Sequence, residues 1–138
     1  MQMDLKLAHE EFERGITHTG FHYTMSLIKR KYKLGIIYCL MMNGPTRYNE
    51  LKRRLEAATF RSLTNSLKEL EADGLISRKE YSQIPPKVEY DLTEKGKSMT
   101  PFLELLCDCG ADLLIQTNKY HKKSNCTLIL IMQPLELR

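Results

Sequence analysis

Two stretches with a helical period of apolar residues occupy the middle of the chain, and a stretch with a period of two follows them. In the first, Tyr48, Leu51 and Leu55 recur at spacings of three and four residues, which places them on one face of a helix. An Asn-Gly-Pro sequence ends the preceding apolar run, and Thr46 then offers a hydroxyl as a helix cap. The pattern predicts a helix over residues 47–55.

The second helical pattern begins after Thr59, another candidate helix cap. Its apolar stripe consists of Phe60, Leu63, Leu67 and Leu70. Its opposite face carries two cations, a hydroxyl and a carboxamide, which belong to Arg61, Thr64, Asn65 and Lys68. In the major groove of DNA, Arg and Lys bind guanine, Asn binds adenine, and cations and hydroxyls hold phosphates. This face therefore indicates a DNA-reading helix, and the alternative is an ordinary solvated helix face.

A hairpin pattern comes next. Residues 75–81 have mixed polarity, and residues 88–92 alternate between apolar and polar side chains. Between them, Pro85 and Pro86 cannot donate ladder hydrogen bonds and therefore predict a stiff hairpin tip. We expect Lys87, beside this tip, to reach a phosphate or the minor groove. Helix, turn, helix and hairpin in this order predict a winged helix-turn-helix, a mainly α fold with a small β-hairpin wing (α+β).

Apolar-rich segments precede these patterns at residues 23–28 and 32–42. Their core candidates are Ile36, Ile37, Leu40 and Met41, which have the spacing of a helix packed beneath the DNA-reading pair. A basic cluster lies between the two segments and consists of Lys29, Arg30 and Lys31, followed by Lys33. Such a charge run is usually solvated, and the alternative is phosphate contact near the start of a helix.

Thr100 and Pro101 predict the start of a further helix. Its apolar residues at helical spacing are dimerisation candidates, namely Phe102, Leu103, Leu106, Cys109 and Leu113. Because Leu105 and Leu114 are also apolar, this helix requires burial on two sides, and a second copy of the chain supplies the second side. We therefore expect a dimer through the terminal helices. Residues 115–138 form a tail, for which an extra strand, a dimer arm and disorder are the alternatives.

Three runs of sequence together resemble the HxlR-type winged helix-turn-helix transcriptional regulators of bacteria and archaea. They are GPTRYNEL at residues 44–51, LKELEADGL at 67–75 and IPPKVEYDLTEKG at 84–96. The resemblance covers residues 23–114 and implies a homodimeric, sequence-specific DNA-binding regulator without catalytic activity. It indicates an N-terminal extension or arm at residues 1–20, the winged domain with its dimerisation helix at 21–114, and the tail.

The chain departs from this family at the residue that several members use to sense electrophiles or oxidants. Those members carry a cysteine just ahead of the first core helix, and the aligned residue here is Thr19. Their sensing mechanism is therefore not carried over. The family's Gly-Gly-Lys-Trp sequence is also replaced, by Lys29-Arg30-Lys31-Tyr32.

The charge distribution agrees with the predicted DNA-reading segment. The chain has 138 residues and a net charge of +4, and residues 47–68 hold six Lys or Arg against two Glu, while the remainder is neutral. Extending this window to Asp73 adds three acidic residues, which we expect to point away from phosphates at the far end of the helix. We find no stretch apolar enough for a membrane span or a secretory signal, so we expect a cytoplasmic protein without a membrane partner.

The four cysteines raise the alternatives of a metal site and a redox switch. A zinc site would require Cys107, Cys109, His121 and Cys126, but residues two apart on a helix point about 200° from each other. We therefore expect no metal and no cofactor. Cys39 lies in an apolar stripe and is expected in the core. A redox switch through Cys107, Cys109 or Cys126 across the dimer stays open.

The resulting hypothesis is a transcriptional repressor that binds double-stranded DNA at an inverted-repeat operator as a homodimer and answers to an unidentified effector or oxidant. Its candidate DNA-binding residues are Arg47, Thr59, Arg61, Ser62, Thr64, Asn65, Lys68 and Lys87, with Arg61 and Asn65 as the leading base readers. The alternative is a winged-helix protein-interaction module, which the cationic face opposes because protein interfaces favour aromatic anchors. An enzyme is not expected, because no nucleophile elbow, phosphate loop or metal triad is recognisable.

Overall fold

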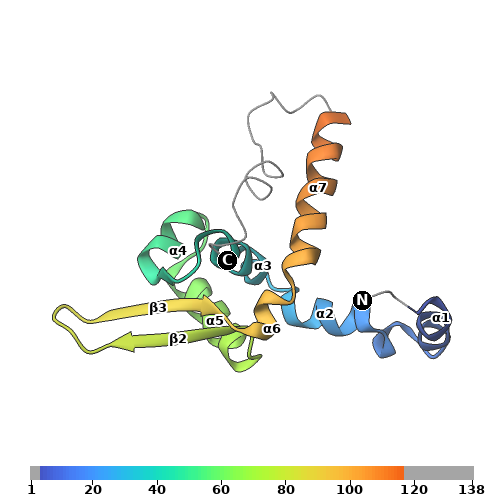
Figure 1. Ribbon diagram of the computed structural model, residues 1–138, viewed down its shortest axis with the longest axis horizontal. Coiled ribbons are helices and arrows are strands. Elements are labelled where there is room, and N and C mark those ends of the chain that lie inside the picture. The colour runs from blue at the N-terminus through green and yellow to red at the C-terminus, as the bar shows by residue number, and fades with distance from the viewer. Residues whose placement is uncertain (1–3, 117–138) are drawn as a thin grey trace. The chain divides into compact units, whose positions relative to one another are not determined.

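The computed structural model describes residues 4–116 and divides the chain into two units, Met1–Gly96 and Lys97–Arg138 (Figure 1). The elements of the first unit are α1 (Leu5–Glu13), η1 (Ile16–His18), α2 (Gly20–Ile28), α3 (Lys33–Asn43), β1 (Thr46–Arg47), α4 (Tyr48–Arg54), α5 (Phe60–Ala72), β2 (Ile76–Tyr81) and β3 (Lys87–Leu92), with α6 (Glu94–Lys97) at its end. The second unit contains α7 (Thr100–Gln116). The predicted mainly helical fold with a β-hairpin wing is confirmed.

The core of the first unit forms where α3, α4 and α5 meet. Its largest side chains are at most 2% exposed and include Ile36, Ile37 and Leu40 of α3, Leu51 of α4, and Leu63, Leu67 and Leu70 of α5. These residues confirm the predicted apolar stripes, except that the fourth core candidate of α3, Met41, is only half-buried. The prediction is wrong for Phe60, which is 67% exposed because it occupies the first turn of α5, where its ring stacks on Tyr48 with centroids 6.1 Å apart.

The two ends of α5 are fixed by local hydrogen bonds. The Thr59 hydroxyl accepts a hydrogen bond from the backbone N–H of Ser62 at 3.1 Å, which confirms Thr59 as the helix cap. At the other end, Gly74 has a φ of 72°, a conformation that glycine adopts without steric penalty. The N–H of Leu75 then returns to the carbonyl of Leu70 at 2.9 Å.

Thr46 is not a helix cap, contrary to the prediction. It lies in β1, where it pairs with Tyr90 of β3, and its hydroxyl donates to the carbonyl of Gly44 at 2.8 Å. The following helix, α4, begins at Tyr48 and has no side-chain cap. Thr46 and Arg47, which the sequence pattern assigns to the start of the helix, are thus paired with β3 instead.

The sheet has the antiparallel order β1-β3-β2. β2 and β3 pair from Ile76 with Leu92 to Tyr81 with Lys87, and Figure 1 shows this hairpin projecting beyond α4 and α5. The predicted wing is therefore confirmed. Lys87 belongs to the first pair of β3 rather than to the turn.

Lys33 is a buried cation at the start of α3. It is only 4% exposed, and its Nζ lies 3.0 Å from Glu69 and 3.2 Å from Asp73, both on the last turns of α5 or just beyond them. The sequence pattern places this lysine with the basic cluster of residues 29–31, for which solvation and phosphate contact are the alternatives. The ion pairs instead join the start of α3 to the end of α5.

In the second unit, α7 confirms the helix predicted from Thr100. Leu103 is 2% exposed in the single chain, whereas the other predicted dimerisation residues are exposed: Phe102, Leu106, Cys109 and Leu113. Ile115 continues the helix, and the rest of the predicted tail, with His121 and Cys126, lies outside the described residues. Within residues 4–116, no helix has the length and apolar character needed to cross a membrane.

The ion pairs of Lys33 predict a measurable effect on stability. Replacing Lys33 with Met keeps the aliphatic chain but leaves two carboxylates, each about one-third exposed, without their cation. We expect Lys33→Met to lower the free energy of unfolding by about 1–3 kcal/mol, measured by urea denaturation. Lys29→Met, at an exposed position, is the control and should change it by less than about 0.5 kcal/mol. Equal effects of the two substitutions would show that the buried ion pairs do not stabilise the fold.

Candidate nucleic-acid interface

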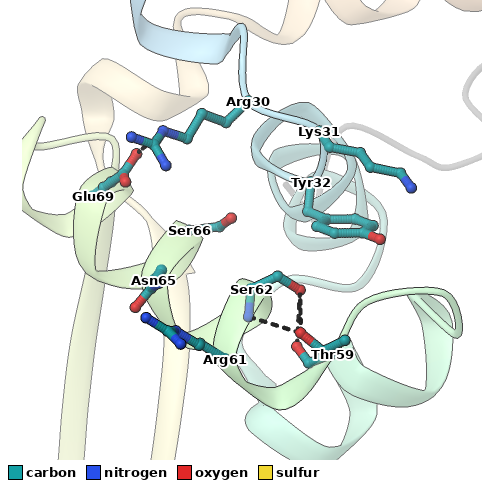
Figure 2. A pocket seen from close by; sticks show the side chains of 9 residues that line it. All are labelled: Arg30, Lys31, Tyr32, Thr59, Arg61, Ser62, Asn65, Ser66 and Glu69. Atoms are coloured by element: carbon teal, nitrogen blue, oxygen red, sulfur yellow. Dashed lines mark hydrogen bonds and ion pairs between the residues drawn. The ribbon is translucent and has the colours of Figure 1, made fainter.

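The outward face of α5 carries the polar side chains that the sequence analysis singled out. Arg61, Asn65 and Lys68 are exposed, and none of them has an ion pair or side-chain hydrogen bond within residues 4–116. Figure 2 shows the Arg61 and Asn65 side chains next to each other on this face. Because Leu63 and Leu67 are buried on the opposite face, the exposed groups are held outward by the packing of the helix.

Thr64 differs from its predicted neighbours on this face. It is half-buried, and its hydroxyl oxygen lies 3.3 Å from the hydroxyl oxygen of Tyr48. The Tyr48 hydroxyl also lies within hydrogen-bond distance of the carbonyl of Phe60, to which it donates at 3.2 Å. Thr64 therefore connects α5 to α4. The apolar spacing accounts for the ring of Tyr48 alone, and its hydroxyl is the sequence signal for such a polar contact.

The other hydroxyls at the start of α5 are used by the helix itself. Thr59 and Ser62 exchange hydrogen bonds, since the Ser62 hydroxyl donates to the Thr59 carbonyl at 3.0 Å while the Thr59 hydroxyl caps the Ser62 N–H. Both residues lie at the helix end that borders Arg61 (Figure 2). Their first role is to fix this end of α5.

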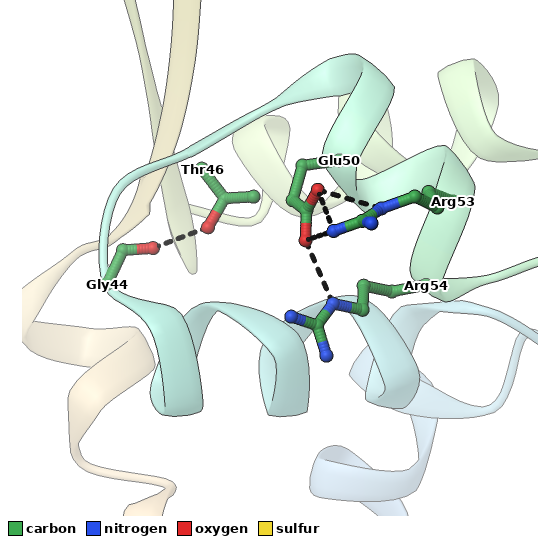
Figure 3. Close-up of polar contacts among 5 residues, drawn as sticks. All are labelled: Gly44, Thr46, Glu50, Arg53 and Arg54. Atoms are coloured by element: carbon green, nitrogen blue, oxygen red, sulfur yellow. Dashed lines mark hydrogen bonds and ion pairs between the residues drawn. The ribbon is translucent and has the colours of Figure 1, made fainter.

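Two arginines of α4 are paired with one carboxylate. Arg53 Nη2 lies 2.7 Å and Arg54 Nε 2.9 Å from the carboxylate oxygens of Glu50 (Figure 3). The hydrogen bonds from Arg53, and then those from Arg54, lower the pKa of Glu50, and the same contact raises the pKa of Arg53. The single charge of Glu50 is therefore shared by two arginines, and α4 keeps a net positive charge.

The wing contains a similar internal pair. Lys87 Nζ lies 2.7 Å from Glu89 and 4.6 Å from the ring centroid of Tyr81, whose hydroxyl donates to Glu89 at 3.1 Å. The hydrogen bond from Lys87 lowers the pKa of Glu89, and the nearby charge of Arg47 adds to this effect. Lys87 is predicted to reach DNA, and in the single chain Glu89 competes with a phosphate for its ammonium group. Arg47 itself is exposed on β1.

Two of the three acidic residues after Lys68 also have cationic partners, whereas Glu71 has none within residues 4–116. Glu69 pairs with Arg30 at 3.2 Å in addition to Lys33, and Asp73 pairs with Lys33. Their charges are thus compensated at the end of α5 remote from Thr59. The positive charge without an acidic partner within the described part of α5 belongs to Arg61 and Lys68.

The cysteines differ in accessibility. Cys39 is half-buried, and desolvation raises the pKa of its thiol although the nearby Arg54 opposes this shift. Cys107 is half-buried and Cys109 is exposed on α7, while Cys126 lies outside the described residues. Thr19, at the position of the family's sensing cysteine, caps α2 by accepting a hydrogen bond from the His22 N–H at 3.2 Å.

The sequence is similar to a family of helix-turn-helix proteins and to several of its members. Residues 27–118 match the HxlR-like helix-turn-helix family. An uncharacterized HTH-type transcriptional regulator of Halalkalibacterium halodurans is 53% identical over 97 residues, which cover 70% of this chain and 86% of that protein. The uncharacterized HTH-type transcriptional regulator YkvN of Bacillus subtilis is 50% identical over 91 residues, which cover 66% of this chain and 76% of YkvN.

Two solved structures are similar in fold and in sequence. The crystal structure of the HTH-type transcriptional regulator YtcD aligns with a TM-score of 0.66 and 42% identity, covering 70% of this chain and 97% of YtcD. The redox regulator HypR in its oxidized form aligns with a TM-score of 0.63 and 40% identity, covering 67% of this chain and 94% of HypR.

Proposed function

The chain belongs to the HxlR-like helix-turn-helix family of transcriptional regulators, and from this premise we propose that it is a repressor that binds an inverted-repeat operator as a homodimer. It is a DNA-binding regulator rather than an enzyme. Repression by occupancy requires a helix that reads the major groove and a dimer that presents two such helices.

The exposed face of α5 is the observation that carries this proposal. Arg61 and Asn65 stand one turn apart, where Arg matches guanine and Asn matches adenine in the major groove, and Lys68 extends the same face. Since neither Arg61 nor Lys68 has an acidic partner within residues 4–116, no ion pair must break before these two side chains contact DNA. We assign Arg61 and Asn65 to base recognition, and Arg47, Lys68 and Lys87 to the phosphate backbone.

Dimer formation through α7 completes the proposed binding mode. Six apolar residues of this helix are exposed in the single chain, namely Phe102, Leu105, Leu106, Leu113, Leu114 and Ile115. An exposed apolar surface of this kind marks an interface. A twofold dimer places its two recognition helices about 34 Å apart, one turn of DNA, which is why we expect an inverted repeat.

The alternative function is a winged-helix module that binds protein instead of DNA. The unpaired cations of α5 disfavour it, because protein interfaces are depleted in lysine and favour aromatic anchors. The exposed Phe60 at the start of α5 is the one feature of this face that fits a protein partner. A gel shift at low salt with random competitor DNA distinguishes the two functions.

Substitution of Arg61 tests the assignment of base recognition. We expect Arg61→Ala to weaken binding to the operator by about 1–3 kcal/mol and to relax preference at one base pair, measured by gel shift on single-base operator variants. Arg54→Ala is the matched control, because Arg54 is already paired with Glu50. Arg54→Ala should leave the sequence preference unchanged, so any loss of affinity should be the same for all operator variants. An unchanged sequence preference in Arg61→Ala would contradict this assignment.

A charge placed on α7 tests the dimer. Leu113→Glu puts a carboxylate on the exposed apolar surface, where burial against a second copy would desolvate it. We expect this variant to be monomeric in analytical ultracentrifugation and to bind a half-site and a full operator with similar affinity. The control Asp112→Asn, at the adjacent exposed residue, should remain dimeric. A dimeric Leu113→Glu variant would place the interface elsewhere.

Oxidant sensing is a second part of the proposal, supported by the similarity to the redox regulator HypR and by the exposed Cys109. We expect peroxide or quinone to weaken DNA binding by the wild type, and replacement of Cys107, Cys109 and Cys126 with Ser to remove this response. Cys39→Ser is the control and should retain the response, because burial raises the pKa of that thiol and disfavours the reactive thiolate. A triple variant that still responds would show that these cysteines are not the sensor.

A further inference from the structure

An open cleft lies between the loop before α3 and the N-terminal half of α5. Its volume is about 570 Å³, within the range of small-molecule sites. Arg30, Lys31 and Tyr32 form one wall, and α5 contributes the other wall with Arg61 and Ser66 among its residues (Figure 2). Every residue that lines the cleft belongs to the first unit of the chain.

Ser66 is the most unusual residue of this cleft. It is only 5% exposed, yet its hydroxyl has no hydrogen-bond partner in the part of the chain that the structure describes. Figure 2 shows the hydroxyl oxygen pointing from α5 into the space toward Tyr32. No buried side-chain oxygen within the described residues lacks a partner, so this hydroxyl oxygen is open to solvent in the cleft and is free to donate to a bound acceptor.

The charges around the cleft favour an anion. Three cations line it, Arg30, Lys31 and Arg61, against one carboxylate, that of Glu69. Glu69 is itself paired with Arg30 at 3.2 Å and with Lys33 at 3.0 Å, and Lys33 does not line the cleft, so its charge is compensated without Lys31 or Arg61. Lys31 and Arg61 keep their charges for a ligand, since neither has an acidic partner within residues 4–116.

Tyr32 gives the cleft an apolar wall. Its hydroxyl is occupied, because it donates to the carbonyl of Ala57 at 2.8 Å, and this bond holds the ring in place. Lys31 Nζ lies 5.3 Å from the ring centroid. The cleft thus combines a fixed aromatic face, two available cations and a hydroxyl donor.

We propose that this cleft binds a small organic anion, a phosphate monoester or carboxylate with an apolar body, whose oxyanion accepts from Ser66 and pairs with Lys31 and Arg61. The apolar body lies against the Tyr32 ring. Arg61 and Asn65 line the same cleft and form the proposed base-reading pair, so an occupant competes directly with DNA. The cleft is then the effector site of the regulator, and only this regulatory part rests on the proposed function.

Phenyl phosphate is the probe for direct binding, because it joins an oxyanion to an aromatic ring. In calorimetric titration of the full chain without DNA, we expect saturable binding at millimolar concentrations, with phenol not binding. Ser66→Ala should weaken this binding about tenfold, as expected for a hydrogen bond to a charged group. Lys31→Ala should weaken it as well. The control Lys68→Ala, which removes an α5 cation outside the cleft, should bind the probe as the wild type does.

The second arm measures operator binding by gel shift at matched ionic strength, because salt alone weakens DNA binding. We expect phenyl phosphate to weaken DNA binding by the wild type, and Ser66→Ala to bind DNA normally while needing about tenfold more probe. The site is overturned if the wild type does not bind the probe. It is also overturned if Ser66→Ala, with the melting temperature of the wild type, binds the probe equally well. Probe binding that leaves DNA affinity unchanged overturns its regulatory role. If the wild type binds the probe through Ser66 but binds no DNA, the proposed function fails and the anion site stands.

Discussion

The rotational position of α5 about its own axis decides which of its side chains are buried and which face outward. Leu63, Leu67 and Leu70 are at most 2% exposed, and turning the helix by one residue, about 100°, would bring them toward water. Burial of each leucine stabilises the fold by about 1.5–3 kcal/mol, which exceeds what a surface ion pair contributes. Arg61 and Asn65 therefore face outward because of the leucines behind them, without any contact that holds them there.

Carboxylates then decide where positive charge remains available. Glu50 pairs with two arginines of α4, Glu69 pairs with Arg30 and Lys33, and Glu89 pairs with Lys87 on the wing. Apart from the buried pair with Lys33, such surface pairs contribute little to stability, but the carboxylate competes with a phosphate for each paired cation. The charge that remains on α5 lies beside its amide and hydroxyl groups. A count of basic residues along the sequence could not distinguish these two classes of cation.

The elements that could be predicted are those whose signal is local. The leucine spacing predicts α5, Thr59 predicts its cap, and the alternation of apolar and polar residues predicts the wing. Each of these features depends on residues within a few positions of one another. Thr46 was misassigned because a hydroxyl before an apolar pattern fits a cap or a strand end equally, and pairing with the distant Tyr90 decides between them. The burial of Lys33 likewise depends on acidic partners from another helix.

Ser66 shows how a departure from simple packing points to a site. It lies on the buried side of α5 together with Leu63, Leu67 and Leu70, where alanine would fit without a polar atom and with a better helix propensity. The Ser66 oxygen nevertheless reaches solvent, because no buried side-chain oxygen within the described residues lacks a partner. Local rules of this kind are broken mainly at functional sites. The hydroxyl opens into a cation-lined cleft, so a polar residue on the packed side of α5 supplies the donor that an anion requires.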